Sequence, residues 1–231
     1  MLSISNLNQY YGQSHTLWDV SFDVPDKSCT CVLGRNGVGK STLMQCIMGL
    51  APKVDGEIIF DGQNILKLPS ERRAPMGIAY IPQGRQIFAQ LTVEENIRTG
   101  FFASTKKHKR VPDDIYELFP VLKEMRNRRG GDLSGGQHQQ LAIARALVLE
   151  PKLLVMDEPS EGIQPTIVQE IGSVITKLNT EREIAVLIVE QKLPFARRVG
   201  EHFVILDRGR LQAQGAITEL SDELVSQHLS V

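Results

Sequence analysis

The sequence predicts an α/β fold in which a parallel core sheet carries a small antiparallel β subdomain and an inserted helical subdomain. The continuous apolar runs at 152–156 and 184–189 are typical of parallel strands that helices cover on both faces. Residues 2–5 and 20–24 alternate between apolar and polar side chains, which indicates an antiparallel layer with one face covered. Between about 84 and 133, charged, helix-favouring segments replace the apolar runs and predict the helical subdomain.

A single domain is expected over residues 1–231. Its core should comprise about 1–83 and 134–231, and the helical subdomain about 84–133, within which the segment 113–125 favours helix. The sequence contains no internal repeat or low-complexity linker. A chain of 231 residues is long enough for one substantial core with a sizeable insertion.

The composition excludes several classes of protein. With 42% hydrophobic and 23% charged residues, the chain is expected to be globular rather than disordered or fibrous. A formal net charge of -1 does not suit a protein that coats nucleic acid, so no nucleic-acid partner is expected. No apolar run approaches the ~20 residues needed to cross a bilayer, and residues 1–6 do not resemble a signal peptide. A cytoplasmic protein is therefore expected.

The three cysteines are predicted to be buried, reduced residues. Cys29, Cys31 and Cys46 are odd in number and lie in apolar segments. A metal site at Cys29 and Cys31 is the alternative, but two ligands without a second pair close no tetrahedral site.

A basic cluster at 106–110 lies in a polar stretch. It is expected to be a solvated loop, and contact with anionic lipid is the alternative.

A glycine-rich segment matches the eight-residue phosphate-loop pattern, GxxxxGKS. An apolar strand, 29–33, precedes it, and a helix that ends at Gly49 is predicted over 41–48. The pattern comprises Gly34, Arg35, Asn36, Gly37, Val38, Gly39, Lys40 and Ser41.

The chemistry of phosphate binding explains these residue types. Glycines let backbone N–H groups point at phosphates, and the helix N-terminus adds the positive end of its dipole. Lys40 is expected to reach the β and γ oxygens, and Ser41 to offer its hydroxyl to Mg²⁺. Thr42, the next residue of the helix, completes the expected nucleotide contacts. A chance glycine-rich turn is the alternative, which the flanking strand and helix disfavour.

The strand at 152–156 delivers two carboxylates to the edge of the sheet where nucleotide sites lie. Asp157 is expected to hold Mg²⁺ through water. Glu158, one residue further, is expected to position or deprotonate the water that attacks the γ-phosphate. Adjacent acidic residues at a strand end are often only solvated, but the phosphate loop favours the catalytic interpretation.

The string Leu133–Gln137, LSGGQ, resembles the signature motif of ABC-type ATPases, which belong to the P-loop NTPases. Ser134, Gly135, Gly136 and Gln137 open a helix predicted over 137–149 and make a second anion-binding N-terminus. In that family the signature of one subunit closes over ATP held by the phosphate loop of the other. The resemblance therefore implies a head-to-tail dimer, and a capped helix start without a ligand is the alternative.

The same resemblance implies roles for other positions. Tyr11 matches the aromatic residue that stacks on adenine, although Tyr10 could substitute and a tyrosine of the core is the alternative. Gln83 matches the glutamine that touches Mg²⁺ and senses the γ-phosphate. Residues 84–88 would form the groove that receives a helix of the membrane subunit, and 160–165 match the loop that links the two sites of the dimer.

The sequence departs from the family after the run 184–189, where a histidine is usual and Gln191 stands instead. An amide still donates a hydrogen bond to the γ-phosphate but does not titrate near neutral pH. Hydrolysis with little pH dependence from this position is therefore expected. His202 lies nearby but begins an apolar strand, so a structural role is expected for it.

The string at 189–191 resembles that of branched-chain amino acid importer ATPases and their urea importer relatives. The strings at 7–12, 34–40 and 227–231 are most similar to those of the urea branch. The resemblance implies an ATPase that uses ATP and Mg²⁺ and works peripherally on the inner face of the cell membrane. Its partners would be a second, related ATPase subunit, integral membrane permease subunits and, indirectly, a solute-binding protein. Urea uptake is the function expected first, and branched-chain amino acid uptake is the alternative.

Two other functions fit the sequence less well. A non-transport ABC ATPase acting on DNA or ribosomes would carry long coiled-coil arms or two sets of motifs. A P-loop kinase would need an acceptor pocket and no signature string.

Overall fold

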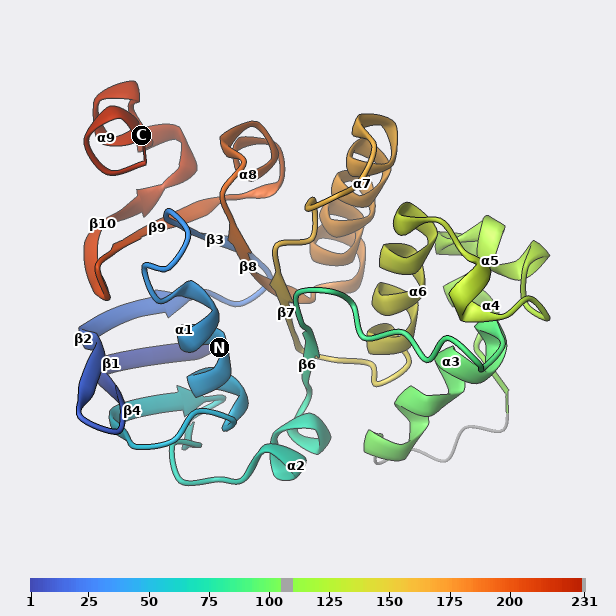
Figure 1. Ribbon diagram of the computed structural model, residues 1–231, viewed down its shortest axis with the longest axis horizontal. Helices are drawn as coiled ribbons and strands as arrows, with labels where there is room; N and C mark the ends of the chain where they lie inside the picture. The colour runs from blue at the N-terminus through green and yellow to red at the C-terminus, as the bar shows by residue number, and fades with distance from the viewer. Residues whose placement is uncertain (105–109, 230–231) are drawn as a thin grey trace.

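The computed structural model describes residues 1–104 and 110–229, which form two sheets and a set of helices (Figure 1). The strands are β1 (Leu2–Tyr11), β2 (Ser14–Val24), β3 (Cys29–Leu33), β4 (Val54–Phe60), β5 (Gln63–Asn64), β6 (Ile78–Ile81), β7 (Leu153–Asp157), β8 (Ala185–Glu190), β9 (His202–Asp207) and β10 (Arg210–Ala216). The α-helices are α1 (Lys40–Met48), α2 (Ser70–Arg73), α3 (Val93–Thr99), α4 (Asp113–Leu118), α5 (Pro120–Glu124), α6 (Gly135–Leu147), α7 (Pro165–Arg182), α8 (Leu193–Val199) and α9 (Asp222–His228).

The core sheet confirms the predicted α/β fold. Its strands follow the order β10-β9-β3-β8-β7-β6. All neighbours from β9 to β6 run parallel, while β10 pairs with β9 antiparallel. The carboxyl ends of β3, β7 and β8 therefore meet at one edge of the sheet, which is where ligands bind in sheets of this kind.

Residues of β8 point alternately into two hydrophobic clusters, one on each face of the core sheet. Ala185, Leu187 and Val189 join the cluster that contains α1 and the antiparallel strands. Val186 and Ile188 join the cluster that contains α6, α7 and α8. Because both faces of the strand are covered, its residues 185–189 are all apolar and show no alternation.

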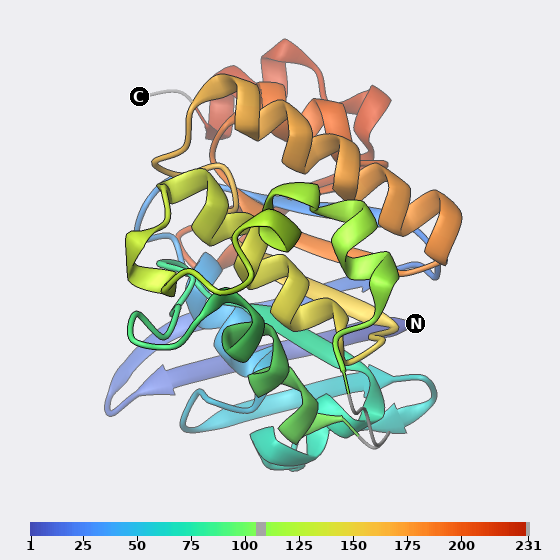
Figure 2. The same cartoon turned by 90° about the vertical axis from the view of Figure 1, so that its right-hand side faces the viewer.

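The elements that cover one face of the core sheet differ from the prediction. Helices were predicted on both faces, but a four-stranded antiparallel sheet, in the order β2-β1-β4-β5, covers one face together with α1 (Figures 1 and 2). The alternating segments predicted as an antiparallel layer form part of this sheet, in β1 and β2. Their apolar side chains share a hydrophobic cluster with α1. One helix and one sheet therefore cover the face on which a layer of helices was expected.

The helix-favouring segment 113–125 forms two short helices instead of one. Phe119 separates α4 from α5 with φ -133° and ψ 73°, because a residue before a proline is disfavoured in the α region and Pro120 follows it. Both helices join α3 and α6 in the larger hydrophobic cluster.

Cys29, Cys31 and Cys46 are buried and free, as predicted. Of the basic cluster at 106–110, only Arg110 belongs to the described residues, where it lies 4.0 Å from Asp113; the remainder of that prediction lies outside them. In the described part of the chain, no helix is both long and apolar enough to cross a membrane.

Candidate functional site

The glycine-rich loop connects β3 to α1 and needs its glycines for two reasons. Gly37 and Gly39 have φ of 79° and 109°, a region that other residues rarely adopt. A Cβ on Gly34 would lie 2.5 Å from the carbonyl oxygen of Leu206, so only glycine fits there. The helix begins at Lys40, one residue before the predicted start.

Lys40 lies at the centre of this loop and is only 4% exposed. Its Nζ donates to the carbonyl oxygens of Gly34 (2.8 Å) and Arg35 (2.9 Å) and lies 3.7 Å from Oε1 of Glu158. Burial lowers the pKa of Lys40, and the carboxylates of Glu158 and Asp157 oppose that shift. The ammonium group is thus held between the loop and the end of β7.

A cavity of about 250 Å³ brings together residues from four separate segments. Thr16, from β2, is the one member that the sequence did not suggest, because nothing local to β2 marks it. The lining residues are Thr16, Asn36, Gly37, Gly39, Lys40, Ser41, Thr42, Gln83 and Glu158.

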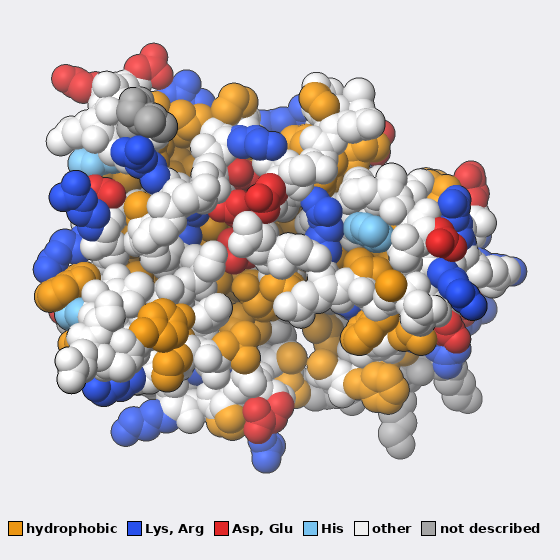
Figure 3. Space-filling view, viewed as in Figure 1, with side chains coloured by type: hydrophobic (Ala, Val, Ile, Leu, Met, Phe, Trp, Pro, Cys, Tyr) orange, Lys and Arg blue, Asp and Glu red, His pale blue; other side chains and the backbone are white. Residues whose placement is uncertain are grey.

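The end of β7 places one carboxylate inside the protein and the next at the surface of the cavity. Asp157 is 4% exposed, and its Oδ1 has no hydrogen-bond partner among the described residues. Burial raises the pKa of Asp157, and the neighbouring Ser41 hydroxyl opposes this shift. Glu158 has φ 50°, which turns the chain away from the strand direction. Figure 3 shows acidic side chains gathered near the middle of this face of the molecule.

Gln191 follows β8 and contacts the neighbouring strand end. Its Nε2 donates to Oε1 of Glu158 at 2.5 Å. The residue that stands in place of a histidine and the residue proposed as base are therefore in direct contact, although 33 positions separate them. His202 begins β9, consistent with its expected place.

Gln83 lies two residues beyond β6 and is exposed. Its Nε2 donates to Oε2 of Glu161 at 2.9 Å, and Nη2 of Arg85 donates to the backbone carbonyl of Glu161 at 2.6 Å. The loop after β6 therefore contacts the segment 160–165, which follows Glu158.

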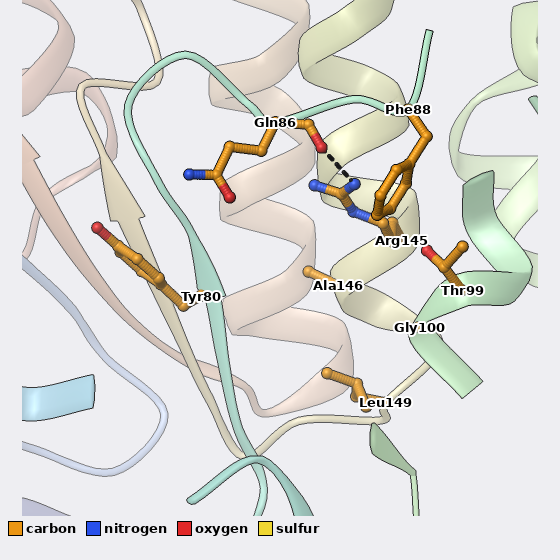
Figure 4. Close-up of a pocket in the computed structure, with 8 residues that line it drawn as sticks. All are labelled: Tyr80, Gln86, Phe88, Thr99, Gly100, Arg145, Ala146 and Leu149. Atoms are coloured by element: carbon orange, nitrogen blue, oxygen red, sulfur yellow. Dashed lines mark hydrogen bonds between the residues drawn. The ribbon is translucent and has the colours of Figure 1, made fainter. Parts of the chain in front are cut away.

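A second cavity, of about 380 Å³, lies beside this loop (Figure 4). Arg145 of α6 holds the loop by donating from Nη1 to the carbonyl of Gln86 and from Nη2 to that of Arg85, both at 2.7 Å. Phe88 leaves 51% of its surface exposed at the cavity. The lining residues are Tyr80, Gln86, Phe88, Thr99, Gly100, Arg145, Ala146 and Leu149.

The signature string begins α6 two residues earlier than predicted, and the helix ends at Leu147 rather than 149. Ser134 and Gln137 form a capping box: Ser134 Oγ accepts from Gln137 N (3.3 Å), and Gln137 Oε1 accepts from Ser134 N (2.8 Å). Neither these residues nor Gly135 and Gly136 line the cavity of the phosphate loop.

The two adjacent tyrosines have different surroundings. Tyr11 is 42% exposed, and its hydroxyl donates to Oε1 of Gln45 in α1 at 2.8 Å. Tyr10 stacks on His15 with ring centroids 4.1 Å apart. Of the two rings, that of Tyr11 is the one held beside the helix that follows the phosphate loop.

Comparison with known proteins gives consistent results. Residues 17–161 match the family model described as "ABC transporter". The chain is 41% identical to the high-affinity branched-chain amino acid transport ATP-binding protein BraG of Pseudomonas aeruginosa, over 91% of each chain. It is 38% identical to the probable branched-chain amino acid transport ATP-binding protein LivF of Archaeoglobus fulgidus, over 95% of this chain and 94% of that one. The structure of the ATP-binding cassette MJ1267 in its ADP conformation superimposes with a TM-score of 0.83 at 28% identity, over 98% and 97% of the chains.

Proposed function

The chain belongs to the ABC transporter family, and from this premise we propose that it is the ATP-hydrolysing subunit of an importer for branched-chain amino acids. The observation that carries the activity is the position of Glu158, which lies between Lys40 of the phosphate loop and the amide of Gln191. The relatives named for branched-chain amino acid transport support the solute.

The loop binds the phosphates of ATP through its backbone N–H groups and the start of α1, and Lys40 turns from its two carbonyl partners to the β and γ oxygens. The exposed ring of Tyr11 offers a stacking surface for adenine. Arg35, Asn36 and Val38 occupy the loop positions between its glycines.

The donor set at the end of β7 fits Mg²⁺, because Asp157 Oδ1 is buried without a partner among the described residues and Ser41 lies beside it. Ser41, Gln83 and Asp157 would hold the ion, Asp157 through water. When bound, Mg²⁺ neutralises charge that develops on the phosphate oxygens.

Glu158 orients the attacking water and accepts its proton. Gln191 holds Glu158 through its amide and donates the second amide hydrogen toward the γ-phosphate. To hold the ion, Gln83 would release its hydrogen bond with Glu161. That release would couple the presence of nucleotide to the segment 160–165.

Two partners complete the assembly. A second ATPase subunit, related to this chain in the natural heterodimer or identical to it in isolation, presents its signature residues to the phosphate loop. Permease subunits insert a helix into the cavity beside Phe88, whose exposed ring supplies apolar surface there. The protein then lies on the cytoplasmic face of the membrane and meets a solute-binding protein only indirectly.

Urea is the second candidate solute. It is favoured by the strings at 7–12, 34–40 and 227–231, which resemble those of urea importer ATPases. Urea is the solute that the sequence alone favours, but the similarity to BraG and LivF supports the amino acid alternative better. No residue of this chain would contact the solute in either case, so the cavity gives no argument for one over the other.

Uptake of labelled leucine and labelled urea tests this proposal in source cells that lack the gene and carry either the wild-type chain or Lys40→Ala. We expect the wild-type chain alone to restore leucine uptake at low external concentration. Restoration of urea uptake alone would transfer the assignment to the urea branch, and restoration of both by Lys40→Ala would contradict the ATPase proposal.

A further inference from the structure

Glu190, the last residue of β8, is a buried carboxylate that the mechanism above does not use. It is 2% exposed, and burying a carboxylate is costly unless hydrogen bonds satisfy it. It accepts three: Oε2 from the Ser160 hydroxyl (2.7 Å), and Oε1 from the backbone N–H groups of Gln191 (2.8 Å) and Lys192 (3.0 Å). The carboxylate therefore joins the turn after β8 to the loop after β7.

Ser160 is hydrogen-bonded to that turn through both its side-chain hydroxyl and its backbone carbonyl. It is fully buried, and besides its hydroxyl bond to Glu190 its backbone carbonyl accepts from Nζ of Lys192 at 2.9 Å. Ser160 lies two residues after Glu158, whose backbone N–H donates to the carbonyl of Val189 at 2.9 Å. The loop that carries Glu158 thus has little freedom to move relative to the turn that carries Gln191.

We infer that Glu190 is a positioning residue for hydrolysis: it sets the backbone of Gln191 so that the amide meets Glu158, and it ties Ser160 to the same turn. This inference rests on the proposed ATPase function. Glu190 touches neither nucleotide nor attacking water; it acts through Gln191 and Ser160. A change of nucleotide state that moves Gln191 is passed by the same carboxylate to Ser160 and the segment after it.

Two substitutions of Glu190 distinguish the effect of its hydrogen bonds from the effect of its charge. In Glu190→Gln, the amide oxygen accepts both backbone N–H groups and the amide nitrogen donates to the Ser160 hydroxyl, which is also an acceptor. That variant keeps the three contacts and loses the charge. Glu190→Ala loses all three contacts together.

The experiment is a double-mutant cycle on the purified chain, with kcat and KM for ATP measured for Glu190→Ala, Gln191→Ala and the double variant. We expect Glu190→Ala to lower kcat about tenfold with KM within about twofold, because a lost interaction of about 1.4 kcal/mol corresponds to one factor of ten. In the Gln191→Ala background the same change should lower kcat by less than about twofold. Glu190→Gln should stay within about threefold of the wild-type rate, because its contacts remain.

An equal loss in both backgrounds would assign Glu190 a purely structural role and overturn the inference. So would a loss in Glu190→Gln as large as that in Glu190→Ala, since charge and not position would then be decisive. Ser160→Ala removes one hydrogen bond and serves where Glu190→Ala does not fold; its effect on kcat should likewise vanish in the Gln191→Ala background.

Glu219→Ala is the matched control, because Glu219 also accepts a backbone N–H, from Ala216 at 3.0 Å, in the segment between β10 and α9. Its kcat should equal that of the wild-type chain. A wild-type chain without ATP hydrolysis would contradict the proposed function itself, an outcome distinct from any result of the cycle.

Discussion

Two helix N-termini in this molecule carry glycine-rich motifs, and their surroundings differ. The phosphate loop surrounds Lys40, which is buried and bound to two carbonyls of its own loop and close to Glu158. The signature string leaves Ser134 exposed, and the Ser134 hydroxyl accepts from the backbone N–H of Gln137 within the capping box. The first motif assembles a site inside one chain, whereas we propose that the second presents backbone donors to a ligand held by another chain.

The glycines of the two motifs differ in the same way. Gly34 has no room for a side chain because the carbonyl of Leu206 is too near. Gly135 has room: a Cβ there would find its nearest neighbour, the carbonyl oxygen of Gly162, at 3.4 Å. Packing within this chain therefore does not require glycine at position 135.

The largest effect is expected from Glu158→Gln, at the self-contained site. Loss of the base should lower ATP turnover by about 10²–10⁴-fold while nucleotide still binds. The variant should then accumulate as an ATP-bound dimer, measured by sedimentation with saturating ATP and Mg²⁺. A chain that remains monomeric under those conditions would contradict the proposal that the signature of a second subunit completes the phosphate site.

Gly135→Ala and Gly136→Ala form a matched pair at the signature. Gly135→Ala should leave Tm unchanged and lower hydrolysis about tenfold, because its methyl group would enter the space of the partner's phosphates. Gly136→Ala should lower stability by about 1–3 kcal/mol, because its Cβ would lie 2.7 Å from Cγ2 of Ile167. Thermal denaturation and hydrolysis assays separate the two, and full activity in Gly135→Ala would count against a ligand at this motif.

Asp157→Asn should raise the stability of the protein while it lowers turnover. Burial raises the pKa of Asp157, so its stabilising contribution is complete below the unfolded value and is lost as pH rises through the folded one. The ionised carboxylate is therefore a cost at neutral pH without metal. We expect Tm to rise by about 2–4 °C, the shift that about 1 kcal/mol produces in a chain of this size. An unchanged or lower Tm in metal-free buffer would contradict this interpretation.

The smallest effect is expected from pH at Gln191. Because an amide does not titrate, hydrolysis should vary by less than about twofold through this position between about pH 6 and 8. The control is Gln191→His, which should introduce an inflection near the reference histidine value of about 6.5. An inflection there in the wild-type chain that disappears in Gln191→Ala would show that the prediction is wrong.

Features encoded by a local pattern could be predicted from the sequence, whereas contacts between distant residues could not. The phosphate loop with its flanking strand and helix is local in the chain, so its pattern was sufficient to predict β3, α1 and Lys40. The contact of Gln191 with Glu158 spans 33 positions and that of Arg145 with Gln86 spans 59, so no local pattern reports either. The true start of α6 could have been predicted, because serine followed by glutamine three residues later is a capping-box signature. The antiparallel sheet that covers the core sheet could not be placed from the sequence, because a strand pattern does not specify the layer against which the strand packs.

Subunit mixing tests most directly whether the signature of one chain completes the phosphate site of another. Lys40→Ala and Gly135→Ala chains are each assayed alone and then together. A head-to-tail dimer of the two contains one site with both defects and one site with none. We expect the mixture to recover about a quarter of wild-type hydrolysis, since about half of randomly paired dimers are mixed and each has one intact site. A mixture no more active than the average of its parents would contradict it.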